Sequence, residues 1–328
     1  MTEARALWTV APGRCEIRAE TLPPRGEAQA LVRMVASGIS RGTERLVLAG
    51  QVPTSQAAAM RCPLQAGDFP FPVKYGYAAV GVVEDGPAPL RGRRVFVLHP
   101  HQDRFLAPAA MCIPVPDGVP DGRAVLAANM ETAVNVAWDA RPLAGERALV
   151  IGAGVVGLLV ASLLARMPGM EVAVCDIDPR RQAVVEALGA RFVAPGEAPA
   201  ERDLIVHASA DPAGLRLALG LAAFEGRIVE ASWYGTKEAT LPLGEAFHAK
   251  RLSIVSTQVG AVAPAMRGRR SHAERMTLAL ALLAEDRFDA LTGPATPFDA
   301  LPEALPHLLN PPPGGPAPLC PVVTYSRS

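Results

Sequence analysis

The middle of the chain alternates short apolar runs with longer segments whose apolar residues recur at helical spacing. β-Branched apolar runs predict strands, and the segments between them predict helices. The expected strands are 147–152, 171–176, 203–208, 227–231 and 252–256, and the expected helices are 155–167, 179–189, 212–223 and 271–285. Such alternation is typical of a parallel sheet covered by helices on both faces.

The first third of the chain has a different pattern. From Ala6 to about Val115, short apolar runs such as 30–35, 79–84 and 94–98 alternate with proline and glycine turns. This pattern is typical of a compact antiparallel β domain. A helical pattern over 123–139 then leads into the middle region.

These patterns predict two domains. Residues 1–122 together with 290–328 would form the antiparallel β domain, and residues 123–289 the parallel one. The final apolar run, 322–325, would return the chain to the first domain. A length of 328 residues fits two domains of the usual ~150 residues, and half of the residues are apolar, enough for a core in each.

Composition excludes several classes of partner and location. Lys plus Arg equal Asp plus Glu at 32 each, and the largest basic cluster is the short segment 267–270, so we expect no nucleic acid or membrane partner. The N-terminus lacks the apolar core of a signal peptide, and no apolar run reaches membrane-spanning length, which predicts a cytoplasmic protein. Five scattered cysteines without a C-x-x-C pair predict reduced thiols.

The strand that opens the middle region runs into a G-x-G-x-x-G sequence. Gly152 permits a tight turn, Gly154 lets the backbone approach a pyrophosphate, and Gly157 lets the following helix pack close to its strand. The helix begins at Val155 and Val156, where free N–H groups and the positive end of the helix dipole attract phosphates. This arrangement predicts a dinucleotide-binding site.

An acidic residue stands where such a site needs one. Asp176 ends the second strand, and 176 − 157 places it 19 residues beyond Gly157. The spacing suits a carboxylate that accepts hydrogen bonds from the ribose hydroxyls of an adenosine. Because the same carboxylate repels a 2′-phosphate, we predict that NAD(H) is preferred over NADP(H), a preference that nearby Arg180 and Arg181 could soften.

Two further residues are assigned to the cofactor site because they follow later strands of the sheet. Ser209 comes directly after strand 203–208, and Trp233 comes shortly after strand 227–231. Ligands bind at the carboxyl ends of such strands. For Trp233, ordinary packing under a loop is the alternative.

At this point the order of the parts resembles a known family. Ser37-Gly38-Ile39, the strand entry from Gly76 to Gly81 and the trailing dinucleotide domain resemble the medium-chain dehydrogenase/reductase family, which includes alcohol dehydrogenases. The resemblance covers essentially the full chain. It implies an α/β fold, with a GroES-like antiparallel β catalytic domain and a doubly wound Rossmann domain that binds a nicotinamide cofactor. The sequences of segments 37–40, 42–45 and 76–77 are similar to the zinc-lacking branch that contains bacteriochlorophyllide hydroxyethyl dehydrogenases.

The chain departs from this family at the zinc ligands. Ser40 and Arg41 stand where zinc members carry a cysteine, Tyr77 stands where they carry a histidine, and segment 128–131 replaces the second cysteine region. The four-cysteine lobe of the structural zinc is missing as well. Zinc needs three or four converging Cys, His or carboxylate ligands. We therefore predict no zinc and no other metal.

Without a metal, another group must stabilise the oxygen of the substrate during hydride transfer. The phenol of Tyr77 is our first choice, because the resemblance places it at the position of a zinc-ligating histidine, and Lys74 or Arg41 would lower its proton affinity. Ser40 and Thr43 would pass a proton. The alternatives are that Tyr77 is a packed strand residue and that the two hydroxyls cap a helix.

Other polar residues are assigned weaker roles. Glu131, beside apolar residues in a predicted helix, is a candidate for acid/base work or for binding Arg41. Glu44 is expected in a structural ion pair. His99 and His101 are expected to supply surface or pocket-lining polarity, because a third metal ligand is not evident near them.

The sequence thus predicts a zinc-independent oxidoreductase that transfers a hydride between NAD(H) and a secondary alcohol or carbonyl. An enone or quinone reductase of the same fold is one alternative, and a nucleotide-binding protein without turnover is another. The partner would be a small-molecule substrate. Strand 252–256 lies near the expected edge of the Rossmann sheet, and an unpaired apolar edge favours a homodimer.

Overall fold

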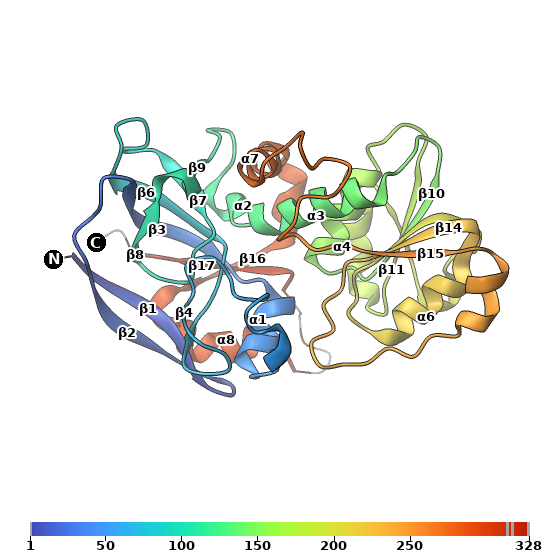
Figure 1. Cartoon of the computed structure of the whole chain (residues 1–328), viewed down its shortest axis with the longest axis horizontal. Coiled ribbons are helices and arrows are strands. Elements are labelled where there is room, and N and C mark those ends of the chain that lie inside the picture. The colour runs from blue at the N-terminus through green and yellow to red at the C-terminus, as the bar shows by residue number, and fades with distance from the viewer. Residues whose placement is uncertain (1, 313–314, 316–317, 327–328) are drawn as a thin grey trace. The chain divides into compact units, whose positions relative to one another are not determined.

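The computed structural model describes residues 2–312, 315 and 318–326. It consists of two compact units, one made of Met1–Ala128 and Met276–Ser328 and the other of Asn129–Arg275 (Figure 1). Residues 1, 313–314, 316–317 and 327–328 lie outside the described residues. All of them belong to the predicted first domain, 1–122 with 290–328.

The dividing points of the two units differ from the predicted domain boundaries at 122/123 and 289/290. One reason is Arg123, whose guanidinium donates to the carbonyls of Leu283 and Ala284 and pairs with Asp289 at 2.7 Å. These bonds are made within the first unit. They hold the segment after α7 (His272–Leu282) against the β-rich part of the chain.

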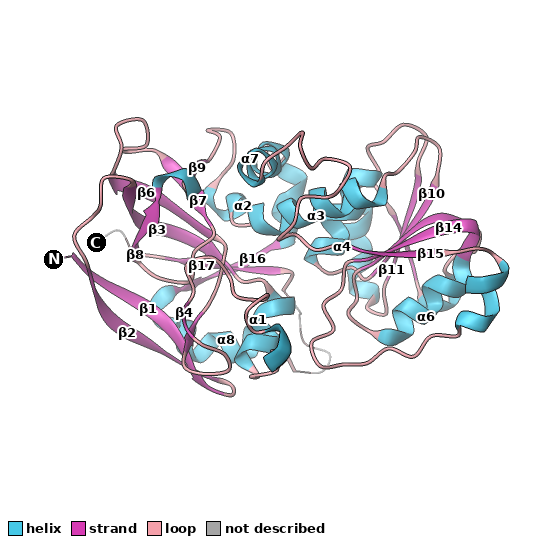
Figure 2. Cartoon of the chain, in the orientation of Figure 1, coloured by secondary structure: helices cyan, strands magenta, loops and turns pink. Residues whose placement is uncertain are grey.

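The first unit is built on two sheets (Figure 2). The four-stranded sheet has the order β2-β1-β5-β4, and the larger sheet has the order β16-β17-β3-β6-β7-β9, with β8 also paired to β3. All pairs are antiparallel except β16 with β17. The strands are β1 (Thr2–Ala11), β2 (Arg14–Leu22), β3 (Gln29–Gly38), β4 (Ala66–Gly67), β5 (Val73–Lys74), β6 (Ala79–Asp85), β7 (Arg94–Val97), β8 (Arg104–Pro108), β9 (Ile113–Pro114), β16 (Thr292–Pro297) and β17 (Cys320–Thr324).

The return of the chain to the first domain is confirmed. Strand β17 pairs antiparallel with β3, with Val322 opposite Gly38. Between β16 and β17 lies a helix that the sequence pattern did not indicate, α8 (Leu301–Leu309), whose Leu301, Leu305 and Leu309 enter the core of this unit. The other helices of the unit include α1 (Arg41–Leu48) and α2 (Asp121–Ala124).

The second unit holds one parallel sheet with the order β12-β11-β10-β13-β14-β15. Counted along the chain this is 3-2-1-4-5-6, the order of the doubly wound Rossmann fold. The predicted fold class, an antiparallel β domain plus a doubly wound Rossmann domain, is therefore confirmed. Its elements are α3 (Ala127–Ala140), β10 (Arg147–Ile151), α4 (Val155–Leu164), β11 (Glu171–Cys175), α5 (Gln182–Ala187), β12 (Arg191–Val193), β13 (Arg202–His207), α6 (Pro212–Leu221), β14 (Ala222–Glu230) and β15 (Ser253–Ser256).

Burial explains why the middle strands were readable from the sequence. The central strand β10 buries Ala148, Leu149, Val150 and Ile151, so both of its faces select apolar residues. Strand β15 is the edge of the sheet and is more exposed. The longest described helix, α3, has 14 residues, and no helix within the described ranges is long and apolar enough to cross a membrane.

Candidate cofactor and active-site residues

The glycine-rich loop connects β10 to α4 and exposes its backbone. Gly152 has φ +109°, a conformation that favours glycine, and a Cβ there would lie 2.8 Å from the backbone nitrogen of Ser209. A Cβ on Gly157 would overlap the carbonyl oxygen of Gly152. A Cβ on Gly154, in contrast, would meet no described atom within 4 Å. The loop is therefore closed against the protein at two glycines and open at the third.

The start of α4 is suited to an anion. Gly154 is the N-cap residue and has no side chain to satisfy the helix, which begins at Val155. The first four N–H groups of a helix, here including those of Val155 and Val156, have no partner inside it. Open backbone, free N–H groups and the helix dipole together make a phosphate site.

Asp176 follows β11 and is tied to this loop. Its Oδ2 accepts a hydrogen bond from the N–H of Ala153 at 2.6 Å, and its Oδ1 accepts one from the N–H of Asp178 at 2.8 Å. Arg180 pairs with Asp178 at 2.7 Å and lowers the pKa of that carboxyl group, and Arg181 lies 3.8 Å from it. The two arginines thus pair with Asp178.

Ser209 lies in the turn between β13 and α6, beside the glycine-rich loop. Its hydroxyl is 2.7 Å from Nε2 of His207, the last residue of β13. Trp233 is half-buried in the segment that follows β14. Both residues are at the carboxyl ends of parallel strands, as expected.

In the first unit, three of the predicted catalytic residues come together. The hydroxyl of Tyr77 is hydrogen-bonded to the side chains of Ser40 and Thr43. Burial raises the pKa of Tyr77 strongly and the charge of Glu44 raises it further, while the two hydrogen bonds lower it by less. The phenol therefore keeps its proton throughout the ordinary pH range and can act as a hydrogen-bond donor.

The helix-cap alternative for Ser40 is wrong. Ser40 is the N-cap residue of α1, but its side chain makes no capping hydrogen bond. Instead, its backbone N–H donates to Oε1 of Glu44 at 2.7 Å. The carboxylate satisfies the helix end, and the hydroxyl of Ser40 is left to contact Tyr77.

Lys74 and Arg41 have hydrogen-bond partners other than Tyr77. Nζ of Lys74 donates to Glu20 at 2.7 Å and to Gln102 at 2.8 Å. The guanidinium of Arg41 donates to carbonyls at and after the C-terminal end of α8, those of Leu308 (3.1 Å), Leu309 (3.5 Å) and Pro318 (3.0 Å). The groups that dominate the pKa of Tyr77 include neither cation, and the net shift is upward.

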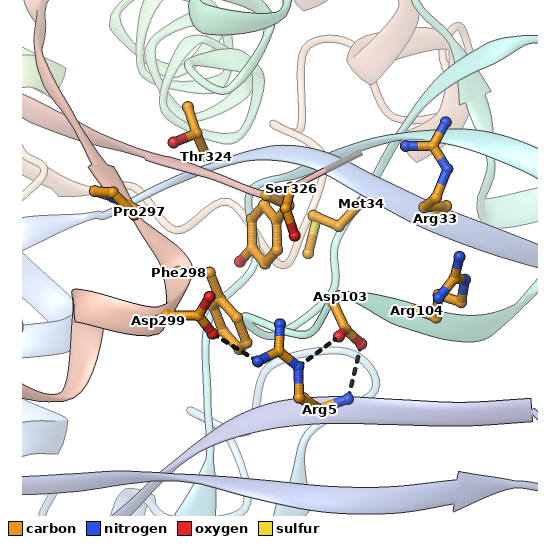
Figure 3. Close-up of a pocket in the computed structure, with 11 residues that line it drawn as sticks. Arg5, Arg33, Met34, Asp103, Arg104, Pro297, Phe298, Asp299, Thr324 and Ser326 are labelled. Atoms are coloured by element: carbon orange, nitrogen blue, oxygen red, sulfur yellow. Dashed lines mark hydrogen bonds and ion pairs between the residues drawn. The ribbon is translucent and has the colours of Figure 1, made fainter. Parts of the chain in front are cut away.

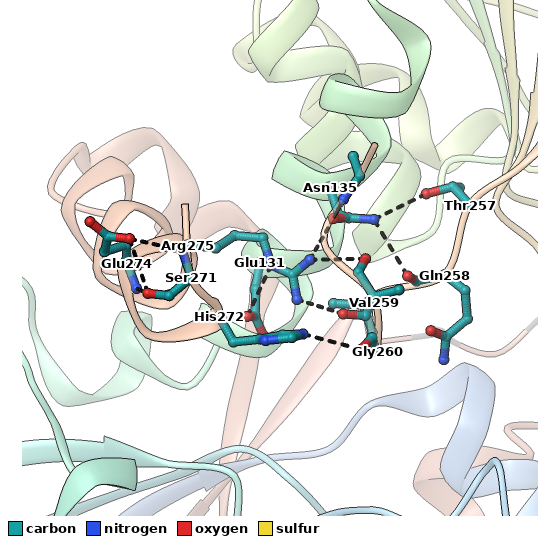
Figure 4. A network of polar contacts seen from close by, with 12 residues as sticks. Glu131, Asn135, Thr257, Gln258, Val259, Gly260, Ser271, His272, Glu274 and Arg275 are labelled. Carbon is teal, nitrogen blue, oxygen red and sulfur yellow. Dashed lines mark hydrogen bonds and ion pairs between the residues drawn. The ribbon is translucent and has the colours of Figure 1, made fainter. Parts of the chain in front are cut away.

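Glu131 does not bind Arg41 either. It forms a buried ion pair with Arg275 at 3.1 Å, and both side chains are almost completely buried (Figure 4). Burial raises the pKa of Glu131, and Arg275 opposes this effect. Arg275 also donates to Asn135 and to the carbonyls of Val259 and Ala261, so the pair fixes the segment after β15.

Of the two roles expected for His99 and His101, the surface position is wrong, because both side chains are buried. His101 does line a small cavity, together with Glu44 and Tyr75. Segment 99–103 runs beside β1, where Gln102 bridges to Ala6, and this pairing turns the two rings inward. His99 stacks on Phe105 with 3.7 Å between ring centroids.

His101 belongs to a buried polar network that sequence reasoning missed. Its Nδ1 is 2.7 Å from Oγ of Ser37, which in turn is 2.9 Å from the hydroxyl of Tyr325. Its Nε2 is 3.1 Å from Oε2 of Glu44. Glu44, expected in a structural ion pair, is buried and has this histidine as its partner. Polar residues inside apolar runs, such as Ser37 in β3, were the available signal.

A cavity of about 240 Å³ is formed by other residues of the chain. It lies in the first unit and is lined by residues that include Arg5, Asp103 and Asp299 (Figure 3). Arg5 pairs with both acids, at 3.1 and 2.6 Å. No predicted site residue lines this cavity, so it is not the candidate active site.

The positions where zinc members of the similar family carry their ligands hold no cysteine or histidine here. In the part of the chain that the structure describes, no three His, Cys, Asp or Glu side chains are grouped so that they could hold a metal ion. At the zinc positions, Ser40 and Tyr77 contact each other, and Glu131 pairs with Arg275. The residues present do not fit a zinc site.

One family model matches most of the second unit, which has the Rossmann fold. Residues 129–254 match the model of the alanine dehydrogenase/PNT C-terminal domain. L-threonine 3-dehydrogenases are similar over short stretches: the protein of Rhizobium rhizogenes is 35% identical over 82 residues, 25% of this chain and 24% of the relative. That of Mesorhizobium japonicum is 33% identical over 93 residues, 28% and 27% of the two chains. The matches thus span about a quarter of each relative.

Solved structures match the whole chain. A short chain alcohol dehydrogenase of Escherichia coli, complexed with NADH, has a TM-score of 0.79 and 18% identity, covering 99% of this chain and all of the other. L-Idonate 5-dehydrogenase of Escherichia coli has a TM-score of 0.82 and 15% identity, covering 99% of both chains. For 2R,3R-butanediol dehydrogenase of Bacillus subtilis the values are 0.78 and 17%, with 98% and 100% covered. The chain has the fold of the medium-chain alcohol dehydrogenases.

Proposed function

We propose that the protein is a zinc-independent oxidoreductase that transfers a hydride between a nicotinamide cofactor and a secondary alcohol or carbonyl. The observation that carries this proposal is the open glycine loop at the start of α4, with Asp176 hydrogen-bonded to it through Ala153. Relatives and structural neighbours named as dehydrogenases support it.

The cofactor would be held by the second unit. Gly152, Gly154 and Gly157, with the N–H groups of Val155 and Val156, would bind the diphosphate. Asp176 would accept hydrogen bonds from the adenosine ribose, which favours NAD(H) over NADP(H). Ser209 and Trp233 would contact the other half of the molecule. When bound, the nicotinamide supplies or takes the hydride.

Tyr77 would stabilise the oxygen of the substrate. Its phenol is held by Ser40 and Thr43 and keeps its proton, so it can donate a hydrogen bond to an oxygen that gains negative charge. In the direction of carbonyl reduction, Tyr77 would orient the carbonyl, and the hydroxyls of Ser40 and Thr43 would pass the proton that the product oxygen takes. Among the predicted catalytic residues, Lys74, Arg41 and Glu131 would have structural roles.

The zinc-independence of this proposal rests on the side chains at the zinc positions. Ser40 is a poor ligand compared with cysteine, and a neutral phenol is a poor one compared with imidazole. Both are also engaged with each other. We further propose a cytoplasmic homodimer that pairs through the exposed edge at β15 and acts on a small molecule.

A substrate screen tests the proposal. Purified protein is mixed with NADH and a panel of ketones, enones and quinones, and with NAD⁺ and secondary alcohols including L-threonine, while absorbance at the NADH band is followed. Turnover of carbonyls or alcohols, with no stoichiometric zinc in elemental analysis, is expected. Turnover of enones or quinones alone would favour a reductase of that class. Cofactor binding without turnover on any member would favour a nucleotide-binding protein, and stoichiometric bound zinc would contradict zinc-independence.

A further inference from the structure

A buried chain of polar side chains in the first unit has no part in the proposed reaction. It starts at the hydroxyl of Tyr325, just after β17, and passes through Ser37 of β3 to the ring of His101. It ends at Glu44 in α1, whose Oε2 lies 3.1 Å from Nε2 of His101. None of the four residues is more than 8% exposed. A buried polar network in which each member has a partner holds its members in one arrangement.

At its inner end this chain holds the backbone of Ser40. Oε1 of Glu44 accepts a hydrogen bond from the N–H of Ser40 at 2.7 Å, and the N–H of Glu44 donates to the carbonyl of Ser40 at 3.0 Å. One residue therefore bonds to both backbone groups of Ser40. A serine at the N-cap normally turns its hydroxyl to an N–H in the first turn of the helix. Ser40, with φ −88° and ψ 89°, makes no such bond, and its hydroxyl contacts Tyr77 instead.

The same chain meets the backbone that leads into Tyr77. Gly76 precedes Tyr77 and has φ +132°, a conformation that favours glycine. A Cβ at Gly76 would lie 3.0 Å from Cδ2 and 3.2 Å from Nε2 of His101. The histidine is itself anchored, because its carbonyl accepts the N–H of Leu7 at 2.9 Å. Its ring therefore packs directly against the segment that carries the phenol.

The geometry points to Glu44 and His101 as the positioning residues of the contact between the phenol and the serine hydroxyl. Glu44 fixes the backbone of Ser40, and His101 fixes the carboxyl group of Glu44 while packing beside Tyr77. The inference rests on the proposed function, in which these two hydroxyls orient the substrate oxygen and pass its proton. Whichever of Nε2 and Oε2 holds the proton between them, the bond fixes the carboxyl group, and the hydroxyl of Ser37 can donate or accept.

Crystal structures of two variants test the positioning without any substrate. Glu44→Met fills a similar volume without the carboxyl oxygen, so the hydroxyl of Ser40 is expected to turn to an N–H in the first turn of α1 and to leave Tyr77. Glu44→Gln keeps an oxygen that can accept the N–H of Ser40, and is expected to keep the contact. A Glu44→Met structure in which Ser40 still contacts Tyr77 would overturn the role of Glu44.

A variant of the histidine tests the other end of the pair. His101→Leu removes the bond to Glu44 and is expected to displace the hydroxyl of Ser40 in the same way. Because Glu44→Met and His101→Leu break one bond from opposite ends, the structure of either variant that folds gives a result. A His101→Leu structure with Glu44 and Ser40 unmoved would overturn the role of His101.

Turnover of a substrate found in the screen shows whether Glu44 acts through Ser40. Ser40→Ala is expected to lower kcat about tenfold, the effect of one hydrogen bond, with NADH affinity unchanged. Glu44→Met is expected to match it, and the double variant to fall no further. Glu44→Gln should keep most of the wild-type kcat. Val95→Ala, buried in β7, is the control for lost stability alone and should lower the free energy of unfolding without lowering kcat.

The outcomes separate this inference from the proposed function. A double variant whose kcat falls by the product of the two single reductions would overturn action through Ser40. The same holds if Glu44→Gln loses as much kcat as Glu44→Met, because the charge and not the position would then matter. A wild-type protein that turns over no member of the panel would overturn the proposed function, while the crystal structures would still decide whether Glu44 positions Ser40.

Discussion

The carboxylate of Asp176 accepts a hydrogen bond from the backbone N–H of Ala153, with 2.6 Å between the two atoms. This bond joins the end of β11 to the glycine loop at the end of β10. The second oxygen of Asp176 accepts the N–H of Asp178. A carboxylate has about four lone-pair positions, so each oxygen still has one for a ribose hydroxyl.

The first prediction concerns cofactor choice. Asp176→Ala is expected to lower NADH affinity at least about tenfold, since hydrogen bonds to a charged group are lost. The affinity for NADPH is expected to fall less, because the substitution also removes the repulsion between the carboxylate and the 2′-phosphate. Fluorescence titration with both reduced cofactors measures the two affinities. Glu186→Ala, at an exposed acid of α5 that leaves Asp178 paired with Arg180, is the matched control and should keep the wild-type ratio. Equal affinity of the wild type for NADPH would show that Asp176 does not select.

The second prediction concerns Tyr77. Tyr77→Phe removes a donor that acts on the oxygen in the transition state, so kcat should fall by ~10²-fold with NADH affinity and thermal stability nearly unchanged. Tyr75→Phe is the control, because Tyr75 is a buried neighbour with 5.9 Å between the ring centroids. It should keep wild-type turnover on a substrate found in the screen. If Tyr77→Phe turned over like the wild type, the phenol would have only a packing role.

Two elements, β10 and α8, illustrate how much of the fold the sequence could predict. Strand β10 was predicted to within one residue, because burial on both faces leaves an uninterrupted apolar run. Helix α8 was missed, because Pro302 and Pro306 in the segment argue against a helix. In the structure Pro302 lies in the first turn of α8, and only Pro306 lies inside the helix, which continues to Leu309. The local sequence pattern therefore fails to predict a helix where a proline is tolerated because of its position in that helix.

Partners across the fold were harder to predict. Arg41 and Lys74 have long side chains, and their contacts with Leu308 and Glu20 join segments far apart in sequence. No local period indicates such pairs. The contact of Ser209 with His207 and Glu230 could have been anticipated, because residues that end neighbouring parallel strands meet at one edge of the sheet.

The third prediction is a homodimer. β15 is the unpaired edge of the parallel sheet, and Val255 on it is 40% exposed. An exposed apolar edge favours pairing with another strand. Light scattering at micromolar concentration should give twice the chain mass of 34.4 kDa. Val255→Asp should shift the mass toward the monomer, whereas Phe224→Asp, at an exposed residue of β14, should not. A monomeric wild type would refute the pairing.

The fourth prediction is that burial of His99 makes the protein sensitive to acid. The ring stacks on Phe105, and its Nδ1 bonds to the carbonyl of Pro100 at 2.8 Å. Burial lowers the pKa of His99 to about 3, and the Pro100 carbonyl only partly opposes this effect. In an unfolded chain a histidine has a pKa of roughly 6.5. Between these values the unfolded state binds a proton that the folded state does not.

The sign of the effect follows from this difference in proton binding. Above pH ~6.5, His99 is neutral in both states and does not reduce the free energy of unfolding. Below that pH, the free energy of unfolding falls by up to ~1.4 kcal/mol per pH unit, which amounts to about 2 kcal/mol at pH 5. His99→Gln keeps a donor for the Pro100 carbonyl but cannot titrate. Urea unfolding at pH 7.5 and pH 5 should therefore show a smaller loss of stability for His99→Gln than for the wild type, whatever their difference at pH 7.5. The other buried histidines are common to both proteins and cancel in the comparison, so equal losses would mean that His99 takes up a proton in the folded state.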